Sequence, residues 1–199
     1  MFIFAINFLI KSRVHRIFCY TNQIKENYDF LGYGKKTCVM PLGYDPKVFN
    51  LTNRKNKKKK FVISYFGRIN KDKGIHILIK SLKKIKTSKW KLLLDIDYID
   101  DKIYFKKILK DLKTKFKKSQ FSCIKADHYK ISDYMKKSDL LVSSNGSTTA
   151  FEAAILRKQV IQLGDLGTTL ELPNVTHHPH LSTLSTVIQK CIKLNLNTD

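Results

Sequence analysis

The sequence predicts an α/β fold with a doubly wound, mostly parallel sheet and helices on both faces of that sheet. Short apolar runs alternate with amphipathic stretches, and the connections between them are short. The apolar runs are continuous, as in FVISYFG at 61–67, which is typical of strands that are buried on both faces. A chain of 199 residues that is 43% hydrophobic can also bury a core without disulfides or metal ions.

The strands are predicted from apolar runs that end at glycine, proline or small polar residues. The run at 37–46, for example, leads into a turn at Pro41 and Gly43. The predicted strands cover 15–21, 37–46, 61–67, 90–96, 121–126, 139–144 and 159–164.

The helices are predicted from apolar side chains that recur at helical spacing. In the stretch after the 61–67 strand, Ile75, Ile79 and Leu82 share one face, and lysines occupy the other. Ser132 and Ser147 stand where N-caps are expected. The predicted helices cover 22–34, 70–85, 100–116, 131–138, 147–158 and 181–194.

The net charge predicts attraction to anionic partners. Lys and Arg number 38 and Asp and Glu 16, so the balance is 38 − 16 = +22. Lysines that merely fill solvated faces, in a chain of AT-rich coding origin, explain the excess equally well. The charges are spread along the chain, and there is no recognisable reading helix, RNP aromatic motif or zinc finger, so nucleic acid is not the favoured partner.

Cysteine spacing and the amino terminus predict a cytoplasmic protein. The four cysteines include no C-x-x-C pair, which disfavours redox and metal motifs. The apolar start MFIFAINFLI is too short to span a membrane and lacks the basic flank of a signal peptide. His177, His178 and His180 are interpreted as a loop, because Pro179 interrupts them and no carboxylate pair accompanies them.

The turns after strands are where a doubly wound sheet binds ligands. The first candidate turn holds Gly67, Arg68 and Lys73: a glycine that lets a ligand approach the backbone, and two cations suited to phosphate. By residue type alone, an ordinary polar turn in a lysine-rich chain fits as well.

Two later turns carry further candidates. SSNGSTTAFE at 143–152 places hydroxyls and free amides at a helix start, a ready anion or polyol site. Simple capping by Ser147 explains the hydroxyls, but it does not explain Glu152 followed by two alanines. The loop at 164–171 is rich in glycine, and such loops either enclose ligands or only turn the chain.

Three segments together carry a family resemblance. PLGYDPKVF at 41–49, SYFGRINKDKGIHILIKSL at 64–82 and SSNGSTTAFEAAILRKQVIQLGDLGTTLEL at 143–172 occur in order at matching α/β positions. They resemble the C-terminal, donor-binding half of the family 4 glycosyltransferases. The resemblance implies the GT-B fold, in which each half is a Rossmann-like domain.

The resemblance also implies roles for matched positions. Arg68 and Lys73 would be the catalytic cations, holding the donor diphosphate as negative charge develops on the leaving nucleotide. Glu152 would bind the ribose hydroxyls, and backbone amides at Gly167 would face the sugar or phosphate. No metal and no cofactor are expected. The full expected donor site comprises Gly67, Arg68, Lys73, Ser144, Thr148, Glu152, Gly167 and Thr168.

Some positions depart from the family pattern. Ser144 stands where the family has the first Glu of its Glu–x7–Glu motif, so no carboxylate is supplied there. Arg157 and Gln159 replace the Gly and Pro of the next turn, and Thr168 replaces a Gly. Whether the reaction retains or inverts the sugar configuration is therefore left open.

The chain length implies half of a two-domain enzyme of this type. Residues 1–45 are expected to be the remnant of an acceptor-side domain, 46–60 a basic linker and 61–199 the donor domain. The expected function is sugar transfer from a nucleotide sugar to a glycan, lipid or polysaccharide, in a truncated or split form whose activity is open. Expected partners are the nucleotide sugar, a separate acceptor-binding domain or subunit, and a peripheral anionic membrane contact. The alternative is a non-catalytic basic module for nucleic acid or anionic membrane.

Overall fold

A computed structural model describes residues 13–40, 43–49, 60–127, 130–144, 147–164, 172, 174–178 and 180–196. The chain divides into two compact units, Met1–Tyr44 and Asp45–Asp199.

The smaller unit is a β–α–β element. Strands β1 (Ile17–Cys19) and β2 (Thr37–Val39) pair in parallel, and helix α2 (Asn22–Tyr28) connects them. Thr21 caps α2 by accepting a hydrogen bond from the Ile24 amide at 3.2 Å. The predicted helix over 22–34 continues past α2 as a π turn and a 3-10 turn, and Gly32 breaks its geometry with φ of 86°.

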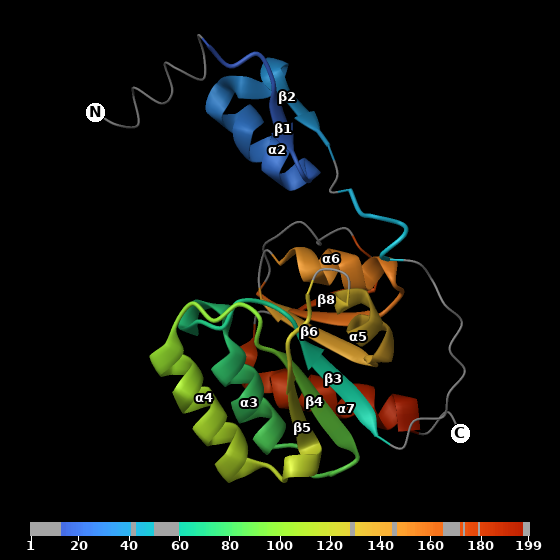
Figure 1. The fold of residues 1–199 in the computed structure, drawn as a ribbon. Helices are drawn as coiled ribbons and strands as arrows, with labels where there is room; N and C mark the ends of the chain where they lie inside the picture. Colours follow the sequence, from blue (N-terminus) through green and yellow to red (C-terminus); the bar gives the residue numbers. More distant parts are fainter. Residues whose placement is uncertain are drawn as a thin grey trace. The chain divides into compact units, whose positions relative to one another are not determined.

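The larger unit contains a six-stranded parallel sheet in the order β5-β4-β3-β6-β7-β8 (Figure 1). The predicted doubly wound fold is therefore confirmed. The order reverses between β3 and β6, which makes their carboxyl ends the expected ligand-binding edge. The strands are β3 (Phe61–Tyr65), β4 (Trp90–Asp95), β5 (Phe121–Ile124), β6 (Leu140–Ser144), β7 (Gln159–Leu163) and β8 (Val175–His178).

Helices cover both faces of this sheet. Residues of α3 (Ile75–Lys83), α4 (Lys102–Lys115) and α7 (Leu184–Leu196) share one buried cluster with one face. Residues of α5 (Ile131–Lys137) and α6 (Thr148–Ile155) share a second cluster with the other face. The apolar spacing predicted for the 70–85 stretch is confirmed, because Ile75, Ile79 and Leu82 are all buried.

Two local predictions are wrong. The HHPH stretch was expected to be a loop, but His177 and His178 belong to β8, which pairs in parallel with β7. Ser132 does not cap α5: Lys130 holds the N-cap position, and Ser132 is buried inside the helix. The pairing edge offered by β7 outweighs the weak strand propensity of histidine.

The first unit ends at Tyr44, one residue before the predicted end, but part of the predicted linker belongs to the larger unit. Val48 and Phe49 were expected in a linker over 46–60, but both are buried in the cluster that contains Phe66 and Leu141. They therefore belong to the core of the larger unit. Residues 50–59, the greater part of the predicted linker, lie outside the described residues.

Candidate functional site

The turn after β3 is shaped by two glycines. Gly67 has φ of 150° and Gly74 φ of 73°, both in the region that favours glycine. Between them a 3-10 turn, Lys71–Lys73, is capped by Asn70, whose side-chain oxygen accepts from the Lys73 amide at 3.0 Å. The sequence thus fixes the backbone at Lys73.

Tyr65, the last residue of β3, ties this turn to the neighbouring strand. Its buried hydroxyl donates to the Lys73 carbonyl at 2.9 Å and has the Ser144 hydroxyl as a second partner. Burial raises the pKa of Tyr65 above its ordinary value, while Ser144 acts in the opposite direction. Tyr65 therefore stays a neutral donor that connects Lys73 with the carboxyl end of β6.

Arg68 projects from the same edge. Its guanidinium lies 3.7 Å from the Asp100 carboxylate, and 60% of the Arg68 side chain is exposed. Asn70 also donates to Asp100 at 3.0 Å, and the Ile69 amide donates to the Tyr98 carbonyl at 2.8 Å. An exposed ion pair of this length contributes little, so the guanidinium is available to an incoming anion.

The amino terminus of α6 is fastened to the end of β3. Thr149 donates to the Phe66 carbonyl at 3.3 Å, and the Ser147 and Thr149 hydroxyls lie 2.6 Å apart. Ser147 occupies the N-cap position, but its side chain makes no capping hydrogen bond. Thr148 is exposed and Glu152 half-buried, and their spacing places them on one face of α6.

These links bring most predicted site residues to one edge of the sheet. Arg68 and Lys73 come from the β3 turn, Ser144 from the end of β6, and Thr148 and Glu152 from α6. Two cations and a helix amino terminus thus occur at the same edge of the sheet, and both kinds of group are suited to a diphosphate. Gly167 and Thr168, the remaining predicted donor residues, lie outside the described residues.

Sequence reasoning missed the residues that brace this edge. Tyr65, Asn70, Asp100 and Thr149 act through contacts between segments that are distant in sequence or through local turn geometry. One available signal was a tyrosine at the end of a buried strand, because a buried phenol generally finds a hydrogen-bond partner.

In the part of the chain that the structure describes, no three His, Cys, Asp or Glu side chains come together in a way that could hold a metal ion. Over the same residues, no helix has the length and apolar character needed to cross a bilayer.

The sequence matches no protein-family model and no curated protein. Solved structures do resemble it. HepE of Anabaena, in complex with UDP and glucose, is 18% identical with a TM-score of 0.78, over 96% of this chain and 57% of HepE. TarM of S. aureus, in a complex that includes UDP, is 13% identical with a TM-score of 0.73, over 92% of this chain and 38% of TarM.

A third match is a single domain. The C-terminal domain of LpcC, a group 1 glycosyl transferase from Francisella tularensis, is 20% identical with a TM-score of 0.61, over 76% of this chain and 88% of that domain. These likenesses show that the chain has the Rossmann-like fold of a GT-B glycosyltransferase half. The chain spans little more than half the length of HepE.

Proposed function

We propose that the larger unit binds a nucleotide sugar and takes part in glycosyl transfer, as a protein similar to the family 4 glycosyltransferases. The observation that carries the proposal is that the turn with Arg68 and Lys73 and the start of α6 are joined at the carboxyl ends of β3 and β6. The hydrogen bonds of Tyr65 and Thr149 join them. Neighbours with the same fold were solved with UDP or UDP-glucose. Their likeness supports a nucleoside diphosphate as the ligand here.

The proposed roles follow from position and charge. Arg68 and Lys73 bind the two phosphates and offset the charge that develops as the nucleotide leaves. Glu152 accepts hydrogen bonds from the ribose hydroxyls, and Thr148 donates to a phosphate or sugar oxygen at the start of α6. Ser144, already engaged with Tyr65, positions that phenol rather than supplying a carboxylate.

The smaller unit supports a further part of the proposal, a contribution to an acceptor-side domain. Cys19 and Thr37, on one face of its two strands, are buried. Phe18, which alternation places on the other face, is 58% exposed. Because parallel sheets are normally covered on both faces and contain more strands, we infer that an acceptor-side domain, on the same or a separate polypeptide, completes this sheet.

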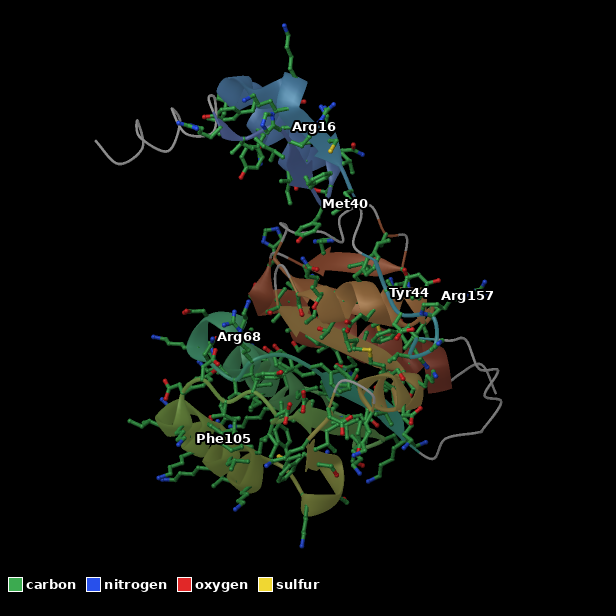
Figure 2. The ribbon with its side chains drawn as sticks, turned by 45° about the horizontal axis from the view of Figure 1, so that its top comes forward. Arg16, Met40, Tyr44, Arg68, Phe105 and Arg157 are labelled. Carbon is green, nitrogen blue, oxygen red and sulfur yellow. The ribbon has the colours of Figure 1, made fainter. Side chains whose placement is uncertain are left out.

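Calorimetric titration with UDP, GDP and ADP and their glucose conjugates tests the binding claim. Arg68→Ala is expected to weaken binding by about 1.5–3 kcal/mol, or tenfold or more in Kd, because a charge-assisted hydrogen bond is lost. Arg157→Ala is the matched control, since Arg157 is an exposed arginine at the opposite end of the larger unit (Figure 2). If folded protein binds none of these ligands, or if both variants bind as wild type does, the proposal fails.

A further inference from the structure

Folding gathers cations that the sequence spreads out. In a parallel α/β sheet, every loop that leads from a helix into the next strand lies at the amino edge of the sheet. Here those four loops cover 84–89, 116–120, 138–139 and 156–158. Together with the last helical turns that precede them, they bring to this edge Lys80, Lys83, Lys84, Lys86, Lys89, Lys113, Lys115, Lys117, Lys118, Lys136, Lys137, Arg157 and Lys158.

This amino-edge patch has few balancing charges. Asp139 is the one carboxylate in the four loops, and it accepts a hydrogen bond from the Val62 amide at 2.7 Å. In the helix before the 116–120 loop, Asp111 pairs with Lys115 at 2.9 Å. Lysines in last helical turns are expected at the negative ends of helix dipoles. That explanation extends to Lys84, the C-cap of α3. It does not extend to the exposed loop lysines at 86, 89, 117 and 118, which form none of the ion pairs found among the described residues.

Apolar surface lies among these cations. Helix α7 runs back toward the amino edge, where Leu194 is 59% exposed and its neighbours Lys190 and Lys193 are exposed as well. A hollow of about 360 Å³ beside Arg157 is lined by Ala154, Ile155, Leu172 and Asn174, and its walls are mostly apolar. Apolar side chains among cations match the boundary between lipid headgroups and acyl chains.

The patch is remote from the candidate donor site. Arg157, in the patch, and Arg68, at the carboxyl edge, lie on opposite sides of the larger unit in Figure 2. A surface bound to the patch would therefore leave the carboxyl edge free. The role of this patch is independent of whether the carboxyl edge binds a nucleotide sugar.

We propose that the amino-edge patch docks the larger unit on the anionic face of a phospholipid bilayer. The binding of a protein to an anionic bilayer strengthens by about 1 kcal/mol for each lysine or arginine near the surface. A nucleic acid is more often held by helix amino termini, arginine forks and stacking aromatics. This edge presents helix carboxyl ends, compact lysine charges and, within the described residues of its loops, no exposed aromatic side chain.

Co-sedimentation of the full chain with phosphatidylcholine vesicles, with and without phosphatidylglycerol, tests the proposal. Wild type is expected to bind only the anionic vesicles, and added salt should release it. The test variant replaces four exposed patch lysines with glutamine: Lys84→Gln, Lys86→Gln, Lys117→Gln and Lys118→Gln. Its partition coefficient should fall by about tenfold or more.

A matched variant separates the patch from the net charge. It makes the same change at four exposed lysines nearer the carboxyl edge: Lys102→Gln, Lys106→Gln, Lys107→Gln and Lys125→Gln. A loss much smaller than that of the patch variant supports the proposal, provided that both variants keep the wild-type circular dichroism. Equal losses, no vesicle binding by wild type, or a patch variant that loses duplex RNA or DNA binding but keeps vesicle binding would overturn it.

Discussion

At the residue scale, the candidate site depends on a glycine in a backbone conformation that other residues rarely adopt. Gly74 closes the turn that carries Lys73 and begins α3, with φ in the left-handed region. A Cβ atom there would meet the Leu163 side chain at 3.3 Å. The glycine is thus required both by its backbone conformation and by the space around it.

We expect Gly74→Ala to lower the free energy of unfolding of the larger unit by about 1–2 kcal/mol, the usual cost of left-handed geometry with a Cβ atom. Gly74→Asn should lose less of that backbone term, since asparagine enters this region more readily. Urea unfolding followed by the fluorescence of Trp90, the single tryptophan, measures both. An alanine variant as stable as wild type would contradict the turn geometry.

The free energy of unfolding of the larger unit should depend on pH through His76. Burial first, and then Lys80, Lys71 and Lys107, hold the pKa of His76 below its ordinary value, and its Nδ1 lies 2.8 Å from the Tyr104 hydroxyl. In the unfolded chain the imidazole takes up a proton near pH 6.5, whereas in the folded protein it stays neutral to lower pH. Acidification through that window therefore favours the unfolded state.

The free energy of unfolding should accordingly fall as pH is lowered from about 7 to 5. His76→Gln should show a shallower fall over the same range, because it has no imidazole to protonate. Urea titrations of both proteins at a series of pH values give the two slopes. Parallel slopes would show that His76 does not contribute.

At the element scale, the predictable parts are those with strong local patterns. The strands β3, β4, β6 and β7 are continuous apolar runs, and the sequence predicts each to within a few residues. Strand β8 was missed because Val175 and His177 do not form a continuous apolar run, and the sequence there resembles a polar loop. These residues become a strand by pairing with β7. The turns of the candidate site were found by their glycines and cations, but the hydrogen bonds that fasten them form only in the folded chain.

Neighbouring threonines at the start of α6 should separate anchoring from binding. Thr149→Val removes the hydrogen bond to the Phe66 carbonyl and should lower the free energy of unfolding by about 0.5–1.5 kcal/mol. Thr148→Val changes an exposed hydroxyl, so it should leave stability near wild type while weakening nucleotide binding. Urea unfolding and calorimetry on both variants measure the two effects. Equal effects on stability would contradict these assignments.

At the scale of the whole molecule, the larger unit has two chemically distinct edges. The carboxyl edge joins Arg68 and Lys73 to a helix start, and the amino edge carries the loop lysines. Along the sequence, the cations show no clustering, because residues that are far apart in the chain come together only through the sheet topology. The chain covers just over half of HepE. In our proposal, the acceptor is bound by the domain that completes the smaller unit.

The central claim is that a nucleotide sugar binds at the carboxyl ends of β3 and β6. Mapping of backbone amide chemical shifts during titration with UDP-, GDP- or ADP-glucose tests it most directly. We expect the largest chemical-shift changes within 67–74, at Ser144 and within 147–152. These changes should saturate as the concentration of at least one donor is raised. Shifts confined to the loops of the amino edge, or none with any donor, would contradict the claim.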